Sequence, residues 1–518
     1  MINTTLIVIP TLTPFLAALS IGVGALSGII AGEAWEKATA RIALAGATLS
    51  LLAGLAALGS GSQETLHLGD WLSSGDYRIG LDFRSDKLSL GLAALFSLLC
   101  LLVIKFSVNY MHREAGYHRF FFVLSLFTAA MQLLVTAGNG ALTFAGWEIA
   151  GFCSYLLIGY AYDRDNAAGN AVRVFVANRI GDAGFVAGLA LSFLWLGGIE
   201  WDAINNGAAG LGDGQRFALA VCFLTAAMAK SAQAPLAPWL ARAIEGPTPS
   251  SAVFYGAVMV HAGVYLLLRL EPLFAASPGA MGLLVLMGAA TALYGFASGL
   301  AQTDVKSALV FSASGQLGLM FAECGLGLWQ LAAWHLAAHA VLRAYQFLAA
   351  PSLMHDTLGL GMRPVPAWLA ERRRWYTAAL QRFWLDHLAD WAVTDPVRRL
   401  AVDLSRFDER VVNRAIGLPE PAVRALSSLA QWEERRLGAY DATTHEDAIR
   451  PLGLFGRLTR WLANGLNHFE QRWVLYGMGE GMLRHARRFG PALNLLDDFM
   501  AQPRYVVLLI LATLLMVF

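Results

Sequence analysis

About eleven apolar segments, each close to 20 residues long, follow one another before residue 350 and limit what this chain can fold into. A helix of about 20 apolar residues spans the hydrocarbon core of a bilayer and satisfies its own backbone hydrogen bonds there. Only 14% of the 518 residues are charged and 57% are hydrophobic, whereas soluble domains carry roughly 25% charged residues. The sequence therefore predicts an all-α polytopic membrane protein of about 12 transmembrane helices.

The distribution of apolar residues also predicts the domains. Residues 1–353 form a transmembrane domain, residues 354–504 an Arg-rich, amphipathic helical region that is cytoplasmic or interfacial, and residues 505–518 a C-terminal membrane helix. The opening segment has neither a basic leader nor a cleavage site, so we expect a first membrane helix there rather than a removed signal peptide. The expected spans before the Arg-rich region lie near Leu6–Ala31, Ala40–Ala57, Leu88–Val108, Phe120–Ala137, Ala141–Tyr160, Val172–Trp195, Phe217–Leu236, Ser251–Leu270, Gly279–Leu300, Val305–Cys324 and Leu328–Ala350.

Basic residues in the loops predict the orientation, because loops rich in Lys and Arg stay on the cytoplasmic side. With the N-terminus outside, the outer connection 197–215 carries no Lys or Arg, and the Arg-rich region is cytoplasmic. The outer loop at 59–87 departs from the rule, since it holds three basic residues among five acidic ones. The inner loops carry Lys37, Arg41, Arg113, Arg119, Arg164, Arg242 and Lys306.

Lys230 is the only charged residue of the apolar stretch 217–240, and Glu148 lies in the apolar run 141–160. A charge at bilayer depth costs at least about 2.5 kcal/mol, so such groups usually face the protein interior and serve a function. Pro235 and Pro238 break the helix after the lysine, which gives Lys230 access to water. The pattern predicts proton handling, with Glu148 controlling whether Lys230 holds its proton. A static Glu148–Lys230 ion pair joining two helices is the alternative.

Three histidines are further candidates for proton transfer, because imidazole titrates near neutral pH. His335 and His339 are four residues apart on one helix face, which Arg343 extends by another turn, and His261 lies in a separate apolar segment. Histidines whose hydrogen bonds are satisfied within the core are the alternative. A metal site at His335 and His339 lacks a third ligand of suitable spacing.

Other polar groups and the cysteines give weaker signals. Asp304 and Lys306 stand at the entry to the helix near 305, where we expect helix-end charges that are at most accessory to a proton pathway. The four cysteines have unrelated spacings within apolar segments and predict neither a zinc nor an iron–sulfur site. A net charge of +1 gives no indication of nucleic-acid binding.

Five motifs resemble a known family and occur in its order: WEIAGFCSYLLIGY, NAAGNAVRVFVANRIGD, AKSAQAPLAPWLARAIEGPTPSSA, HAGVYLLLR and DVKSALVFSASGQLGLM. The resemblance covers roughly residues 83–355 and is to the antiporter-like subunits of respiratory complex I, subunit L above all, and of Mrp-type cation antiporters. It implies proton translocation along a central polar axis. In that axis Glu148 is the glutamate of the WE motif, Lys230 the lysine of AKSAQ, and His335 and His339 the histidines of HLxxHA.

The chain departs from this family in two ways. Arg343 stands where the family usually has a lysine, and Tyr255 stands where members often have a histidine. Complex I subunits also continue into a second half-channel, whereas here the polar region follows the histidine helix directly. That change, together with RAYQFLAAPSLMHD, resembles the DabB-type membrane subunit of the DAB inorganic-carbon accumulation complex. The resemblance implies a bacterial inner-membrane location and a cytoplasmic DabA-type zinc protein, similar to β-carbonic anhydrase, as partner.

These observations predict a membrane subunit in which inward flow of protons or Na⁺ drives a partner, here the hydration of CO₂ to bicarbonate. The alternatives are an ion-pumping subunit of a complex I-like or Mrp-like assembly and an ion-inert scaffold. We expect no catalysis and no cofactor in this chain, with zinc only in the partner. Arg343 is expected to act as an electrostatic gate beside the histidines, or alternatively to reach the inner face as an anchor. The Arg-rich region is expected to dock the partner or to be a solvated tail.

Overall fold

The computed structural model describes residues 6–61, 65–75, 77–257, 259–302, 304–356, 365–407 and 461. By their contacts, the residues form two compact units, one of residues 1–395 with 518 and one of residues 396–517. The first unit contains the membrane helices. The described part of the second unit is residues 396–407 of α20 (Asp395–Phe407) together with residue 461. The C-terminal membrane helix expected at 505–518 lies outside the described residues, and the division at residue 354 stays a prediction.

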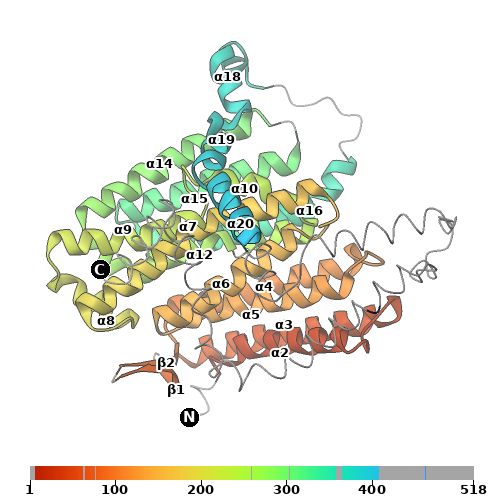
Figure 1. Ribbon diagram of the computed structural model, residues 1–518, viewed down its shortest axis with the longest axis horizontal. Helices are drawn as coiled ribbons and strands as arrows, with labels where there is room; N and C mark the ends of the chain where they lie inside the picture. Colours follow the sequence, from red (N-terminus) through yellow and green to blue (C-terminus); the bar gives the residue numbers. More distant parts are fainter. Residues whose placement is uncertain are drawn as a thin grey trace. The chain divides into compact units, whose positions relative to one another are not determined.

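The first unit is a bundle of long helices that run side by side (Figure 1). Nine helical segments of the described part are long and apolar enough to cross a membrane, which confirms the predicted all-α polytopic fold. The nine segments include residues 248–269, which the structure divides into shorter elements. The continuous long helices are α2 (Ile9–Leu26), α3 (Glu36–Ser60), α4 (Lys87–Tyr110), α5 (Tyr117–Thr136), α6 (Gly140–Ile158), α7 (Asp165–Leu196), α9 (Asp213–Lys230), α14 (Pro278–Leu300), α15 (Val305–Gly325) and α16 (Trp329–Asp356).

Shorter elements connect these helices. They are α8 (Trp201–Gly207), α10 (Pro238–Arg242), α11 (Thr248–Ser251), the π-helical turn η4 (Ala252–Ala257), the 3₁₀ turn η5 (Met259–His261), α12 (Ala262–Arg269), α13 (Glu271–Ala275), α17 (Ala367–Ala370), α18 (Arg373–Leu380), α19 (Leu385–Ala389) and the π turn η7 (Asp390–Thr394). The segment expected near 251–270 as a regular helix is thus irregular over its first half. Such π-helical turns occur often at functional sites.

An antiparallel β-hairpin, β1 (Thr65–Ser74) and β2 (Tyr77–Arg84), occupies the loop between α3 and α4. The sequence analysis assigned no secondary structure to this loop. Yet the apolar side chains of β2 alternate with polar or small ones, a period of two that is typical of a strand. The hairpin leads to Asp86, which caps α4 by accepting a hydrogen bond from the Ser89 amide (2.8 Å).

Arg269, at the end of α12, forms an ion pair with Asp86 and joins the hairpin end of the bundle to its centre. Burial raises the pKa of Asp86, but the Arg269 guanidinium more than offsets this and holds that pKa well below its usual range. Asp86 is therefore ionised at neutral pH and fixes the position of the α12 C-terminus.

Helices α14 and α15 pack backbone against backbone. A Cβ atom added to Gly288 would lie 2.5 Å from the Ala322 nitrogen, and one added to Gly318 would lie 2.5 Å from the Ala292 nitrogen. Small residues at such positions let membrane helices approach closely, where dispersion and weak hydrogen bonds stabilise the contact. These two helices therefore form a tight pair within the bundle.

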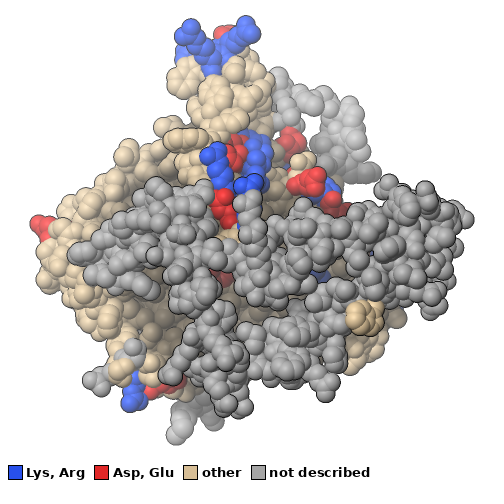
Figure 2. Space-filling model, in the orientation of Figure 1, with Lys and Arg blue, Asp and Glu red and all other residues tan. Residues whose placement is uncertain are grey.

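Charged side chains are rare on the described surface of the bundle, and basic ones gather on and beside α18 (Figure 2). Arg372, Arg373 and Arg374 are all exposed there. Further along, Arg242 pairs with Asp386 of α19 (2.9 Å) and Arg173 pairs with Asp390 of η7 (3.1 Å). Residues 385–394 are thereby tied to α7 and α10.

Candidate functional site

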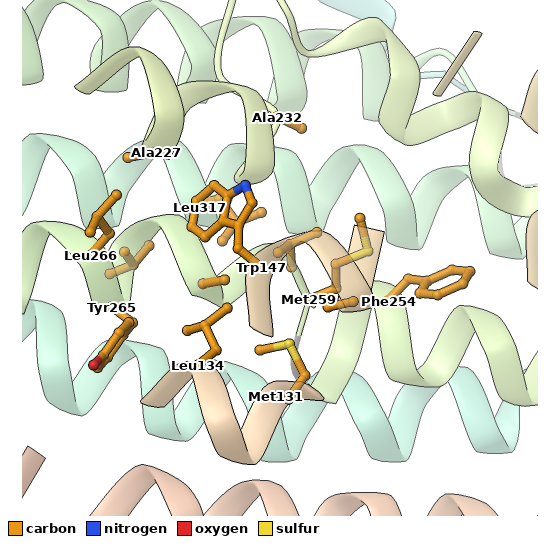
Figure 3. Close-up of a cluster of buried hydrophobic side chains, with 14 of the residues drawn as sticks. Met131, Leu134, Trp147, Ala227, Ala232, Phe254, Met259, Tyr265, Leu266 and Leu317 are labelled. Carbon is orange, nitrogen blue, oxygen red and sulfur yellow. The ribbon is translucent and has the colours of Figure 1, made fainter. Parts of the chain in front are cut away.

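Lys230 is the last residue of α9 and is buried at 1% exposure. Its ammonium donates a hydrogen bond to the backbone carbonyl of Trp147 (3.1 Å) and lies 4.9 Å from the centre of the Trp147 indole ring. Trp147 sits in a dense apolar cluster that includes Met131, Leu134 and Leu317 (Figure 3). The lysine is therefore held by a carbonyl and an aromatic face in a largely apolar surrounding.

The chain unwinds directly after Lys230, as the two prolines predicted, and side chains satisfy its backbone groups. Trp239 Nε1 donates to the Ala229 carbonyl (2.8 Å), and Thr291 Oγ1 accepts from the Ala234 amide (2.9 Å). Ala232 has a left-handed backbone, with φ of 49°, which is unfavourable for a residue with a Cβ atom. Unwound backbone at membrane depth needs such partners. The unwound segment after Lys230 therefore belongs to the candidate site.

Glu148 does not pair directly with Lys230. Its carboxylate Oε2 lies 2.7 Å from Arg179 Nη2, and Arg179 Nε lies 2.8 Å from the Asp182 carboxylate. Asp182 also accepts a hydrogen bond from the Trp147 indole (2.8 Å). Two acids and two bases therefore meet between α6, α7 and α9, and we call Glu148, Arg179, Asp182 and Lys230 the charged cluster.

Two buried carboxylate oxygens of the charged cluster have no hydrogen-bond partner among the described residues, and one of them, Asp182 Oδ2, is in ion-pair contact with Arg179. Among the described residues, Glu148 Oε1 is buried and has no hydrogen-bond partner. Gly151, one turn along α6, provides space for the lysine, since a Cβ atom there would lie 3.1 Å from Lys230 Nζ. An ammonium with room to move and a carboxylate oxygen without a donor can exchange a proton when the two approach.

A second group of polar side chains lies between η5, α15 and α16, and we call His261, His335, His339, Arg343 and Glu323 the histidine cluster. His261 Nε2 lies 2.9 Å from His339 Nδ1, and Arg343 Nε donates to His339 Nε2 (3.3 Å). His261 and His339 are almost fully buried, at 0% and 4% exposure. The structure thus brings His261 to His339 and Arg343, which lie 78 or more residues further along the chain.

Arg343 determines which ring nitrogens carry hydrogen. A guanidinium only donates, so His339 Nε2 must accept, and neutral His339 then carries its hydrogen on Nδ1. That hydrogen is donated to His261 Nε2, which leaves the hydrogen of His261 on Nδ1. Among the described residues, His261 Nδ1 is buried and has no partner. The three groups therefore form a directed hydrogen-bond chain that ends in an unpaired N–H group.

The surroundings of Arg343 favour the gate interpretation over the anchor. The side chain is buried at 5% exposure and donates to Ser312 Oγ (2.6 Å) and Gln346 Oε1 (2.8 Å) as well as to His339. All of these partners lie within the bundle. Its positive charge next to His339 opposes protonation of that imidazole.

His335 is not bonded to His339, although the two share a helix face. Its Nδ1 lies 2.9 Å from Glu323 Oε1, and its Nε2 lies 2.9 Å from Gln316 Oε1. The rings of His335 and His339 are edge to face, with centroids 6.3 Å apart. Among the described residues, no three or more His, Cys, Asp or Glu are arranged to hold a metal ion.

The two clusters are joined at neighbouring residues. Ser231, directly after Lys230, donates through Oγ to the carbonyl of Val260, directly before His261 (2.6 Å). The unwound end of α9 therefore contacts the irregular turn that carries His261. A shift of the break is transmitted to the histidine cluster through this bond.

The remaining predicted residues lie outside both clusters. Asp304 caps α15 by accepting from the Ser307 amide (2.8 Å), and Lys306 donates to Thr248 Oγ1 (2.8 Å). Tyr255, where the family often has a histidine, donates to the Leu240 carbonyl (2.8 Å) and stacks on Phe347. These contacts hold helix ends and the break in position.

Sequence reasoning assigned no role to Arg179, Asp182 or Glu323. The first two stand three residues apart within an apolar span, and such intramembrane charges are themselves a signal of function. Glu323 stands two residues before the end of α15, where an acid looks like an ordinary boundary charge. Only the contact with His335 distinguishes it.

Comparison with known proteins agrees with this architecture. Residues 137–362 match the membrane-domain family "NADH:quinone oxidoreductase/Mrp antiporter, TM", and residues 71–121 match the N-terminal family of complex I chain 5. The chain is 38% identical over 353 residues to NADH-quinone oxidoreductase subunit L of Rhodobacter capsulatus, covering 64% of this chain and 50% of that protein. It is 36% identical over 353 residues to NAD(P)H-quinone oxidoreductase subunit 5 of Paulinella chromatophora, covering 66% and 53%.

Among solved structures, the Mrp complex from Dietzia sp. DQ12-45-1b contains a chain with 26% identity and a TM-score of 0.60, covering 67% of this chain and 38% of that one. The fold and these matches identify the membrane part as multi-pass and antiporter-like, related to the subunits of complex I and of Mrp antiporters. The chain spans about half the length of the curated relatives it matches.

Proposed function

We propose that this chain conducts protons across the bacterial inner membrane through the charged cluster and the histidine cluster. The observation that carries the proposal is Lys230, a fully buried amine at the end of a broken helix. A buried lysine without a function would only cost free energy of insertion. Its surroundings contain groups that exchange protons, which favours H⁺ over Na⁺ as the ion.

Each cluster has its own part in this transfer. Arg179 pairs with Glu148 in place of Lys230, so that a change in the Arg179 contact frees the carboxylate to approach the ammonium. A proton that His261 releases from its unpaired Nδ1–H group passes toward Lys230, because the hydrogen bond from Ser231 to Val260 holds the two segments together. Arg343 keeps His339 neutral until a proton is delivered, which prevents a continuous leak.

The finer proposal is that this ion flow is inward and drives a cytoplasmic, DabA-type zinc protein that hydrates CO₂ to bicarbonate. It rests on the resemblance of residues 343–356 to the DabB type and on the Arg-rich region that follows. The N-terminus is then outside, and residues 354–504 dock the partner. The named relatives support ion translocation and do not bear on this coupling step.

The second candidate is an ion-pumping subunit of a complex I-like or Mrp-like assembly, and it is favoured by the relatives themselves. Purification of the native complex separates the two candidates. A co-purifying zinc protein of the carbonic-anhydrase type supports the first, and quinone-oxidoreductase or antiporter subunits support the second.

Lys230→Ala tests the conduction itself. We expect proton flux into proteoliposomes to fall to the level of protein-free vesicles, because the central proton carrier is lost, while insertion improves. Lys105→Ala is a matched control, since Lys105 is an exposed lysine of α4. Flux is measured with a pH-sensitive dye in vesicles that contain the full chain. Wild-type flux in Lys230→Ala would refute the proposed pathway.

A further inference from the structure

Glu323 is the only carboxylate that contacts a histidine of the histidine cluster among the described residues. It stands two residues before the end of α15, while His335 stands six residues after the start of α16. The short connection between these helices places the pair near one end of the bundle. An acid at this depth that bonds an imidazole is a candidate for proton exchange.

Exposure increases along the cluster toward Glu323. His261 and His339 are at 0% and 4% exposure, whereas the side chains of His335 and Glu323 are at 20% and 17%. This pair therefore reaches the surface of the bundle, and the two buried rings do not. The polar groups form a series that leads from the interior to the edge of the bundle.

Gln316 determines how His335 can act. Its Oε1 accepts from His335 Nε2, so that nitrogen carries a hydrogen and Nδ1 faces the carboxylate. The imidazole and the carboxyl group then share one exchangeable proton across 2.9 Å. The gap to His339, with ring centroids 6.3 Å apart, is one that a single water molecule or a ring rotation closes.

We propose that Glu323 is the residue through which the histidine cluster exchanges protons with water at the end of the bundle where α15 ends and α16 begins. This inference rests on the proposed proton conduction. For the proposed inward flow, one proton enters from water onto the Glu323 carboxylate, and one leaves protonated His335 for neutral His339. His335 and Glu323 thereby return to their starting protonation. The loop charges assign this end to the outer side of the membrane.

A structural role for the pair is the competing explanation, since an ion pair between α15 and α16 also stabilises their packing. The two explanations differ in their dependence on mobile buffer. A lost exchange group can be replaced by a buffer molecule that carries protons to the site, whereas a lost structural contact cannot. The test therefore uses proteoliposomes whose internal and external concentrations of a membrane-impermeant buffer, MES, are varied separately.

We expect Glu323→Gln to lower proton flux roughly tenfold at low buffer and to regain most of it when MES is raised on one side only. Glu323→Asp, which keeps the carboxylate, should retain flux. Glu271→Gln is the control, because α14 and α15 pack antiparallel and Glu271 precedes α14 at the same end. Wild-type flux in Glu323→Gln, or a loss that MES does not restore, would overturn the proposal.

The wild-type protein provides a measurement that does not depend on a variant folding. Dicyclohexylcarbodiimide modifies protonated carboxyl groups in apolar surroundings, and mass spectrometry locates the adduct. We expect loss of flux to follow modification of Glu323; full flux with Glu323 modified would overturn the proposal. Lys230→Ala should stay inactive at every buffer concentration, which separates failure of this inference from failure of the proposed conduction.

Discussion

The charged cluster and the histidine cluster place ionisable groups in the same bundle in opposite ways. Around Lys230, two acids and two bases lie close together: Arg179 pairs with both carboxylates, and Lys230 donates to a backbone carbonyl beside them. Around His339, the described residues provide a buried arginine and two histidines, and the first carboxylate is Glu323, beyond His335. The first arrangement stores a proton by balancing charges, and the second passes one along by changing tautomers.

Burial has different consequences in the two clusters. A buried ammonium stays charged only while carboxylates lie near it, so the charged cluster responds to small movements of Glu148 or Arg179. A neutral imidazole pair needs no counter-charge, and its hydrogen bonds alone fix its state. In the proposed conduction, the charged cluster therefore controls when a proton is released, and the histidine cluster controls the path by which it arrives.

After Lys230→Ala, the largest expected effect comes from Glu148→Gln, which removes one charge of the charged cluster and keeps the shape of the side chain. We expect proton flux to fall about a hundredfold, because Lys230 and Arg179 then share Asp182 alone. Glu148→Asp should be milder, since the carboxylate remains. Flux into proteoliposomes measures both variants. If the glutamine variant conducts normally while Lys230→Ala is inactive, the cluster does not act as a unit.

An intermediate effect is expected from Arg343→Lys, which tests the histidine cluster. Lysine cannot donate from the position of Arg343 Nε, so His339 Nε2 becomes free to take up a proton. We expect passive proton leak to change about tenfold, equivalent to about 1.4 kcal/mol in the barrier. Arg41→Lys, at an exposed arginine of α3, is the control. Equal leak in both variants would make Arg343 a structural residue rather than a gate.

The smallest effect is expected from Gly151→Ala. The added Cβ atom would lie 3.1 Å from Lys230 Nζ, so the ammonium must shift by a few tenths of an ångström. Helix propensity gains up to about 1 kcal/mol, and we therefore expect unchanged or higher thermal stability with flux lowered about threefold. Gly91→Ala in α4 is the matched control, because nothing lies within 4 Å of its added Cβ. Equal flux in the two variants would show that the space beside Lys230 is not used.

Part of this arrangement was predictable from the sequence. The apolar segments predicted the membrane helices, and the two prolines predicted the break after Lys230. The partner of Glu148 could not be predicted, because Arg179 of the next helix, α7, competes with Lys230 of α9 for the carboxylate. The same holds for the contact between His261 and His339, which depends on an irregular π and 3₁₀ segment where the hydrophobic pattern indicated a plain helix.

The close packing of α14 against α15 has a mechanical consequence for both clusters. The backbones are in contact at Gly288 and Gly318, so α14 and α15 cannot slide past each other and act as one rigid unit. Thr291 of α14 accepts a hydrogen bond from the unwound segment after Lys230, and Glu323 lies near the end of α15. In the proposed conduction, the parts that move are therefore the irregular elements η4 and η5 and the unwound segment after Lys230, while α14 and α15 stay in place. A small displacement beside Lys230 then changes the contacts of the histidine cluster and leaves the α14–α15 pair undeformed.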